Sequence, residues 1–394
     1  MSTGSITPSA PSRARIVHAV FAGLAASLVG IGLARFAYTP LLTALIDANW
    51  FPETDAIYLG AANLAGYLAG ALGGRWVAAR SSPRAALRTM MLLASLAFIA
   101  CAWPHSFLWY FAWRFAAGFA GGALMALAAP TIMPLVPTGR QGLAGGLIFT
   151  GVGLGIAASG TLVPLFLGHG VAETWIALGL ISLVLTMAAW TGWPAEAVVA
   201  APPSEAPPTT GPALPALYVA YGLVAAGLVP HMVFLVDFIA RGLGEGLAGG
   251  AFYWVLFGIG AAGGAALAGR LADRFGFRLT LRVTLAVEVA AVALAALVQD
   301  AWALANSAVI VGAYVPGVVP LVLGRSRELA GPDIARQRRA WSLATTGFAL
   351  GQAVAAYLFS WLFAGSGDYL LLYWLGAAAM AAALAVDLVF ANRR

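Results

Sequence analysis

The sequence is poor in charge, in cysteine and in any catalytic signature. Only 9% of its 394 residues are charged, whereas about a quarter are charged in a typical soluble domain. Every basic residue is arginine and lysine is absent. The single cysteine, Cys101, excludes a disulfide framework and a cysteine-based metal site. No Ser/His/Asp or Cys/His constellation and no lysine-containing phosphate loop is present, so we expect no enzyme, no cofactor and no metal.

Long apolar segments are abundant instead. Hydrophobic residues make up 61% of the chain, and a membrane-spanning helix needs about 20 mostly apolar residues. Charged, proline and glycine positions divide the sequence into two sets of six such segments, which predicts an all-α integral membrane protein. The first set is 16–46, 55–79, 86–104, 107–136, 142–167 and 174–194, and the second is 215–240, 247–271, 279–299, 302–324, 340–364 and 368–390.

These sets define the expected domains. Residues 1–15 are rich in serine, threonine and proline and are predicted to form a disordered cytoplasmic tail. Residues 16–194 form the first six-helix bundle, the proline- and alanine-rich stretch 195–214 is a cytoplasmic linker, and residues 215–394 form the second bundle and a short tail. No small-residue cleavage signal follows the first apolar run.

The net charge of +6 reflects orientation rather than nucleic-acid binding. Arginines fill alternate gaps between the segments, and the opposite gaps hold acidic residues with almost no arginine. By the positive-inside rule, both termini face the cytoplasm, which is consistent with a bacterial-type inner membrane. The arginines in these gaps are Arg75, Arg80, Arg84, Arg88, Arg140, Arg270, Arg274, Arg278, Arg282, Arg325, Arg327, Arg336, Arg338 and Arg339.

The two halves repeat each other in sequence. Pro130-x-x-x-Pro134-Leu-Val recurs as Pro316-x-x-x-Pro320-Leu-Val. Arg140-Gln141, followed by Thr-Gly-x-x-x-Gly, recurs from Arg336-Gln337. Repeated halves are typical of secondary transporters, whose two bundles rock about a central binding site.

One loop motif links this layout to a known family. Residues 269–278 read Gly-Arg-Leu-Ala-Asp-Arg-Phe-Gly-Phe-Arg, which resembles the Gly-x-Leu-Ala-Asp-Arg-x-Gly-x-Arg loop of the major facilitator superfamily. Arg114-x-x-x-Gly-x-x-x-Gly is similar to that family's helix-four arginine motif. The first segment, with Gly30-Ile-Gly and Arg35-Phe-Ala-Tyr-Thr-Pro, resembles the YbfB/YjiJ-type branch.

The resemblance implies a cytoplasmic gate between the halves. In the family this loop is a charge-relay latch, so Asp273, Arg274 and Arg278 are its expected members, with Arg75 as the first-half counterpart. Gly74 stands where the first half would carry the acid, so a symmetric latch is not expected. Segment five is rich in glycine, which allows another helix to approach and slide. Its lack of the family's Gly-Pro pair, with Val152 after Gly151, weakens a drug-antiporter reading.

Few ionisable residues lie inside the segments, and such residues are the default functional candidates in a membrane. At about 1.5 Å per residue, Arg35 and Arg114 lie roughly 18 Å and 10 Å from the outer ends of their segments, and His231 roughly 15 Å. In the family these helices line the central cavity. Two guanidinium groups without a nearby acid favour an anion, especially a carboxylate. The predicted substrate site is Arg35, Arg114, Tyr38, Asn63, His231, Tyr314 and Gln352.

Each candidate also has a purely structural interpretation. Either arginine can tie helices together through backbone carbonyls, and His231, a candidate proton carrier, can be a neutral residue bonded to a carbonyl. Asp237 is a second proton-coupling candidate, but an ordinary ion pair with Arg241, four residues on, is favoured. Glu288 is the third, without an obvious partner in the sequence, and burial disfavours its ionised form.

These observations favour a proton-coupled transporter of a small organic anion that works by alternating access. We expect its partners to be that substrate, protons and the bilayer, with no nucleic acid, and we expect a monomer. The alternative is proton-driven efflux of drugs or hydrophobic metabolites, which requires a broad aromatic pocket more than paired arginines.

Overall fold

The computed structural model describes residues 12–194 and 211–390, and these residues form helices joined by short connections. Most of the predicted tail, 1–15, and most of the predicted linker, 195–214, lie outside the described residues.

Ten of the twelve predicted segments begin earlier in the structure than in the prediction. The first begins at Arg13 rather than at residue 16, because the Ser12 hydroxyl accepts a hydrogen bond from the backbone N–H of Arg15, 3.3 Å away, and so caps the first turn. The seventh span begins at Ala213, inside the stretch predicted as linker.

The first half contains six spans, and the first of them is interrupted. It consists of α1 (Arg13–Ser27), a π-helical segment (Leu28–Leu33), α2 (Ala34–Phe36) and α3 (Tyr38–Asp47). The other five are α4 (Glu53–Arg80), α5 (Pro83–Ala100), α6 (Phe107–Ile132), α7 (Gln141–Leu167) and α8 (Val171–Ala189).

The second half repeats this plan, including the interruption. Its first span consists of α9 (Ala213–Gly227), a π-helical segment (Pro230–Phe234), α10 (Leu235–Asp237) and a second π-helical segment (Phe238–Gly242). Pro230 starts the break, as its missing N–H predicts. The other five are α11 (Gly246–Phe275), α12 (Phe277–Leu297), α13 (Ala301–Ala330), α14 (Ile334–Ser366) and α15 (Tyr369–Phe390).

Within the described ranges, eleven helices are long and apolar enough to cross a membrane. The 28-residue α4 completes the series of twelve. It packs closely along α6 through glycines on both helices: a Cβ on Gly66 would lie 2.0 Å from the Phe115 carbonyl oxygen, and one on Gly118 would lie 2.0 Å from that of Asn63. The predicted fold of twelve helices in two pseudo-symmetric bundles is therefore confirmed.

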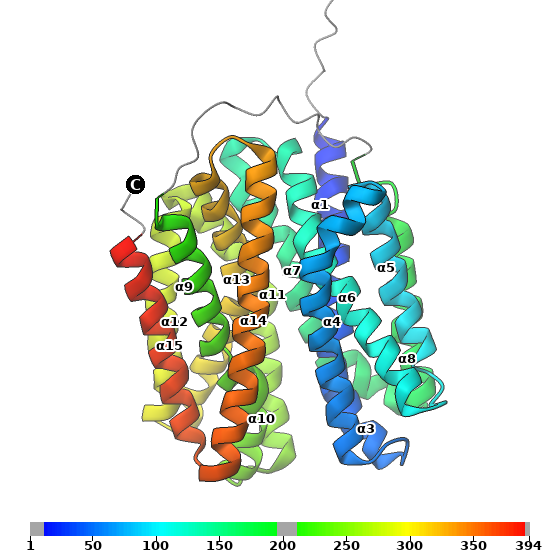
Figure 1. Cartoon of the computed structure of the whole chain (residues 1–394). Coiled ribbons are helices and arrows are strands. Elements are labelled where there is room, and N and C mark those ends of the chain that lie inside the picture. The colour runs from blue at the N-terminus through cyan, green and yellow to red at the C-terminus, as the bar shows by residue number, and fades with distance from the viewer. Residues whose placement is uncertain (1–11, 195–210, 391–394) are drawn as a thin grey trace, which may run out of the picture.

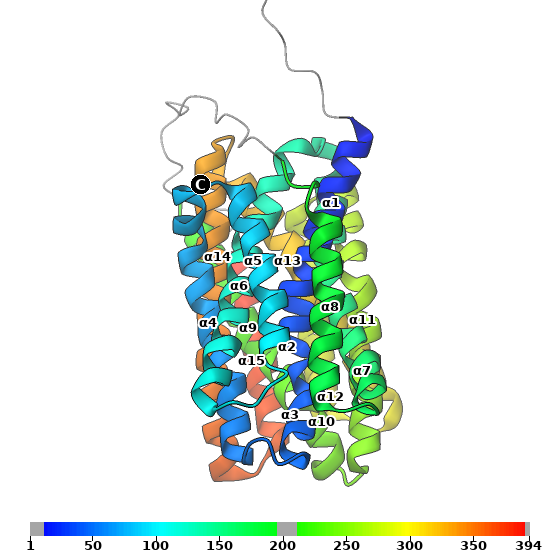
Figure 2. The ribbon, with the colours of Figure 1, turned by 90° about the vertical axis from the view of Figure 1, so that its right-hand side faces the viewer.

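The two bundles stand side by side in Figure 1, with α1 to α8 in one and α9 to α15 in the other, and Figure 2 views the molecule from the side of the first bundle. The start of α1 and the end of α15 lie at the same end of the molecule (Figure 1). That end also holds the α4–α5, α6–α7, α11–α12 and α13–α14 connections, and we call it the arginine-rich end. It is where the orienting arginines of the sequence are concentrated.

The main seam between the bundles runs along α7 and α11. A Cβ on Gly146 would lie 2.4 Å from the Ala265 carbonyl oxygen, and one on Gly153 would lie 1.9 Å from that of Ala261. Gly151 instead faces the first span of its own half, where a Cβ would lie 2.1 Å from the Leu24 carbonyl oxygen. The glycines of segment five thus serve two interfaces, only one of which joins the halves.

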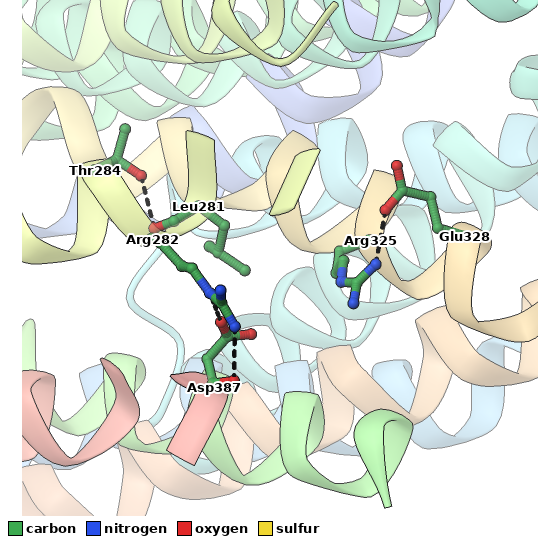
Figure 3. A network of polar contacts seen from close by, with 6 residues as sticks. All are labelled: Leu281, Arg282, Thr284, Arg325, Glu328 and Asp387. Atoms are coloured by element: carbon green, nitrogen blue, oxygen red, sulfur yellow. Dashed lines mark hydrogen bonds and ion pairs between the residues drawn. The ribbon is translucent and has the colours of Figure 1, made fainter. Parts of the chain in front are cut away.

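Equivalent arginines tie the third and sixth helices of each half together at the arginine-rich end. In the first half, Arg88 Nε donates to the Trp190 carbonyl oxygen over 2.8 Å. In the second, Arg282 Nε lies 2.5 Å from Asp387 Oδ2 (Figure 3). The repeat therefore extends to packing contacts, although one half uses a carbonyl and the other a carboxylate.

Candidate functional site

Arg35 lies where the first span is interrupted. The π-helical segment Leu28–Leu33 directly precedes it and contains Gly32, where a Cβ would lie 2.8 Å from the Cα of Gly155 on α7. This close packing needs glycine at both positions. Arg35 Nη2 donates to Gln352 Oε1 of α14 over 2.7 Å, and the arginine remains partly exposed. The predicted residues Arg35 and Gln352 therefore meet across the two halves.

The contact extends to a third span. Gln352 Nε2 lies 3.2 Å from the sulfur of Met232, which belongs to the π-helical segment of the seventh span. On the other side, the Arg35 guanidinium carbon lies 5.9 Å from the ring centre of Tyr67 on α4. Gln352 thus links the interrupted spans of the two halves, with Arg35 on one side and Met232 on the other. The sequence did not single out Met232, because a methionine in an apolar run carries no distinguishing signal.

Arg114 occupies a closed position next to Arg35. It is only 3% exposed, and its Nη1 donates to the Ala34 carbonyl oxygen over 3.0 Å. Its guanidinium carbon lies 4.1 Å from the ring centre of Tyr38, a cation–π distance. Its Nε has no hydrogen-bond partner among the described residues. Arg114 therefore holds the backbone immediately before Arg35.

Two further predicted site residues belong to this scaffold. The Tyr38 hydroxyl donates to the Ala56 carbonyl oxygen over 2.7 Å, and Asn63 Nδ2 donates to the Arg114 carbonyl oxygen over 3.2 Å. Both side chains are buried. Together with Arg114 they join the first, second and fourth spans, so they position Arg35 rather than present an open surface.

His231 lies inside the second half. Its side chain is fully buried, its Nε2 lies 2.8 Å from Ser307 Oγ, and its ring contacts that of Tyr373 edge-on at 4.9 Å. Because Ser307 donates its own proton to the Ala291 carbonyl oxygen over 2.7 Å, the network assigns the donor role to His231 Nε2. Its Nδ1 has no partner within the described ranges. The structure does not bring His231 into contact with Arg35 or Arg114.

Glu288 and Tyr314 form a second buried polar group in that half. Glu288 is fully buried and Tyr314 is 6% exposed. Neither the carboxyl oxygens nor the phenol oxygen has a hydrogen-bond partner in the part of the chain that the structure describes. Both residues lie in the wall of a cavity of about 350 Å³ between α11, α12 and α13. Tyr314, predicted as a member of the substrate site, thus lines the same cavity as Glu288.

Asp237 is paired, as the sequence predicted. Its carboxylate forms an ion pair with Arg241 and also accepts a hydrogen bond from the Tyr369 hydroxyl over 2.6 Å. These two contacts hold the Asp237 carboxylate between the seventh span and α15.

The gate residue Asp273 contacts a helix end rather than arginine. Its Oδ1 accepts from the N–H of Gly142 over 2.8 Å and its Oδ2 from that of Leu143 over 2.7 Å, both in the first turn of α7 in the other half. The first N–H groups of a helix lack partners and carry partial positive charge, so a carboxylate is favourable there. The neighbouring Arg274 lies over the ring of Phe275 at 5.3 Å.

The other predicted gate residues lie apart from this contact. Arg278 lies at the start of α12, after the turn at Gly276. Arg75 lies on α4 and lines a separate cavity at the arginine-rich end. The structure thus brings neither arginine into a hydrogen bond with Asp273.

The sequence did not predict a second contact between the halves at the arginine-rich end. Arg327 Nη1 donates to Gln141 Oε1 and its Nε to Gln337 Oε1, each over 3.0 Å. The Trp341 indole N–H donates to the Met125 carbonyl oxygen over 2.9 Å. Both glutamines belong to the repeated Arg-Gln pairs of the sequence, so the repeat was a signal that could have identified them. The halves are therefore joined at the arginine-rich end.

Two six-helix halves joined across a seam, with a partly exposed guanidinium in an interrupted span between them, are typical of a membrane transporter. A family model described as "Uncharacterised MFS-type transporter YbfB" matches residues 27–388. The chain belongs to this family of the major facilitator superfamily, as the sequence motifs predicted. No curated protein sequence matches the chain.

Solved structures with the same fold are distant in sequence. The E. coli fucose:proton symporter FucP has a TM-score of 0.73 at 13% identity, covering 94% of this chain and 98% of its own. The proton:xylose symporter XylE has a TM-score of 0.73 at 15% identity, covering 96% of each chain. The human organic anion transporter MFSD10 (TETRAN) has a TM-score of 0.75 at 14% identity, covering 96% of this chain and 100% of its own. At these identities the likeness establishes the fold alone.

Proposed function

We propose that this protein is a proton-coupled secondary transporter of a small organic anion, such as a carboxylate, and that Arg35 binds the anion. The observation that carries the proposal is the location and hydrogen bonding of the Arg35 guanidinium. Its guanidinium lies between the halves, remains partly exposed, and has the neutral amide of Gln352 as its hydrogen-bond acceptor in the described chain. A guanidinium fork without a carboxylate partner is suited to a planar carboxylate.

Gln352 supports alternating access in this proposal. An arriving carboxylate competes with the Gln352 amide oxygen for the Arg35 guanidinium, so binding weakens one contact between the halves. A carboxylate is charged and can accept two parallel hydrogen bonds from the guanidinium, whereas the amide offers one neutral oxygen, which favours the exchange. Rocking of the halves then exposes the site on the other side. The arginine-rich end faces the cytoplasm of a bacterial-type inner membrane in this scheme, by the positive-inside rule, and the transporter acts as a monomer.

The proton carrier is most simply Glu288 or His231. A carrier must change its protonation state during the cycle, and both residues are buried with at least one polar atom that lacks a partner among the described residues. Asp237 is less suited, because Arg241 and Tyr369 hold its carboxylate. The structural neighbours FucP and XylE are proton symporters, although at such sequence distance this likeness does not select a substrate.

Uptake into proteoliposomes tests the proposal. Wild-type protein should accumulate a labelled organic acid when a proton gradient is imposed, and Arg35→Gln should reduce the initial rate about a hundredfold, the scale of losing a charge-assisted fork. Arg35→Lys, which keeps the charge but not the fork, should retain part of the activity. A thermal-shift screen of organic acids on purified protein identifies the substrate to use. Full activity in Arg35→Gln, or uptake indifferent to the gradient, would contradict the proposal.

One observation favours efflux of apolar compounds as a second candidate. The cavity of about 350 Å³ beside Glu288 is lined almost entirely by apolar side chains. Leu267, Val283 and Val287 at its edge are exposed on the outer surface of the second half, so a molecule dissolved in lipid can reach it. Resistance of a sensitive host to hydrophobic toxic compounds, retained in Arg35→Gln and lost when Ala313→Trp fills the cavity, is the expected result for this candidate.

A further inference from the structure

The arginine-rich end contains a basic cavity between the halves. It has a volume of about 370 Å³ and lies between α4 and α6 of the first half and the start of α14 of the second. Three arginines line it: Arg75 from one half, and Arg338 and Arg339 from the other. None of the lining residues is acidic. The cavity therefore places like charges from both halves around one space.

These three guanidinium groups are uncompensated. The structure records no hydrogen bond or ion pair for Arg75, Arg338 or Arg339 within residues 12–194 and 211–390. Arg75 and Arg339 are exposed and Arg338 is partly exposed. Like charges around one space repel one another within the screening length, which is about 8 Å in water at physiological salt.

The interface between α11 and α7 is the counterpart of the interface between α4 and α14, and the comparison shows that the second interface lacks an acidic residue. There, Asp273 of α11 binds the first turn of α7 across the halves. The residue equivalent to Asp273 in the first half is Gly74. The first turn of α14 is instead capped by its own Asp333, whose Oδ1 lies 2.8 Å from the N–H of Ala335. No carboxylate of the described chain therefore lies between α4 and α14.

We propose that this cavity binds a phosphate-class anion, either free phosphate or the headgroup of an anionic lipid, and that the bound anion bridges the halves in place of the missing acid. Guanidinium forks bind phosphate oxygens in pairs, and arginines from both halves reach the same space. Apart from Thr131, the rest of the lining, which includes Pro83, Leu127 and Pro130, is apolar and suits the upper part of the acyl chains of a lipid. The site is separate from Arg35 and does not depend on the proposed substrate.

Thermal unfolding of purified protein in a neutral, lipid-depleting detergent tests the site. One arm adds inorganic phosphate and the other adds phosphatidylglycerol, with ionic strength held constant by chloride in both. A ligand that binds the native state raises the unfolding midpoint in proportion to occupancy. We expect a rise of about 2 °C or more in at least one arm. A response only to free phosphate identifies the soluble source, and a response only to phosphatidylglycerol identifies the lipid.

Charge-matched variants show whether the effect comes from this cavity. Arg75→Gln and the double variant Arg338→Gln/Arg339→Gln should each weaken binding about tenfold or more, the scale of a lost charge-assisted hydrogen bond. Arg270→Gln removes an exposed arginine at the same end that does not line the cavity, so it should bind as the wild type does. No shift in either arm, or an equal loss in Arg270→Gln, would overturn the proposal.

Discussion

The two halves share a backbone plan but differ in the chemistry of their interiors. Among the described residues, the first half carries Arg35 and Arg114 in its middle, and no carboxylate bonds to either. The second half carries Glu288 and His231, each with unpartnered polar atoms. The repeat therefore preserves helix packing while cationic and proton-binding groups lie in opposite halves. The proposed cycle uses this division, since motion of one half against the other changes the position of the arginines relative to Glu288 and His231.

Arg35 and Arg114 themselves differ in access. Arg114 is 3% exposed and bonds to a backbone carbonyl of the first span. Arg35 is partly exposed and bonds to a side chain of the other half. A ligand can displace the second contact without breaking the first. In the proposed function, Arg114 therefore supports the first span and Arg35 contacts the ligand.

The largest expected effect on stability comes from Arg114. Arg114→Gln removes the hydrogen bond to the Ala34 carbonyl and the contact with the Tyr38 ring, and it leaves a buried void. The loss should be about 3 kcal/mol, the scale for a buried charged group that is removed from its partners. Thermal unfolding in detergent measures it as a lower midpoint.

Arg35→Gln is the matched control for that experiment. The same substitution at a partly exposed guanidinium should lower the midpoint little, while it abolishes most uptake. Equal destabilisation by the two variants would show that the two arginines do not divide their roles in this way.

A smaller effect is expected at the gate, where the halves can again be compared. Asp273→Asn removes the negative charge from the first turn of α7 but leaves one hydrogen-bond acceptor. The expected cost is about 1 kcal/mol of the closed arrangement at the arginine-rich end, which is about a fivefold change in its equilibrium. Faster labelling of an Ala126→Cys variant in a Cys101→Ser background measures this opening, because Ala126 lines the cavity between the halves there.

Asp333→Asn is the control for the gate. Its carboxylate caps a helix of its own half, so its loss should lower stability without changing the labelling rate. A labelling rate that rises equally in both variants would indicate general loosening rather than a latch formed by Asp273.

The sequence predicted the fold well because the bilayer restricts the alternatives. Segment length, alternating arginines and the internal repeat each report on helices that must span lipid, and each signal is local in sequence. Most helix starts shifted by only one to three residues, and a local cap accounts for the shift at α1, where Ser12 caps the first turn. The break after Val229 followed from Pro230, which lacks an N–H.

The site was less predictable, because depth in the membrane does not fix the direction of a side chain. Arg35, Arg114 and His231 were assigned to one layer by residue counting, but His231 turns into its own half toward Ser307. Tyr314 likewise lies with Glu288. The π-helical segments rotate the chain next to Arg35 and His231 by amounts that composition does not encode. Cross-half partners such as Gln352 for Arg35 become visible only when the bundles are placed together.

Glu288 should give the smallest change in stability and the sharpest test of the division between the halves. Glu288→Gln keeps the size and neutral polarity of a protonated carboxyl group, and neither oxygen has a partner among the described residues to lose. The unfolding midpoint should therefore change by less than the equivalent of about 0.5 kcal/mol. If Glu288 carries the proton, uptake in this variant should no longer respond to a proton gradient, while exchange of labelled for unlabelled substrate continues. His231→Gln provides the comparison, because loss of gradient dependence there with a normal response in Glu288→Gln would transfer the coupling role to the histidine. Loss of exchange as well as gradient-driven uptake in Glu288→Gln would mean that the carboxyl group acts in the motion of the second half rather than in proton coupling.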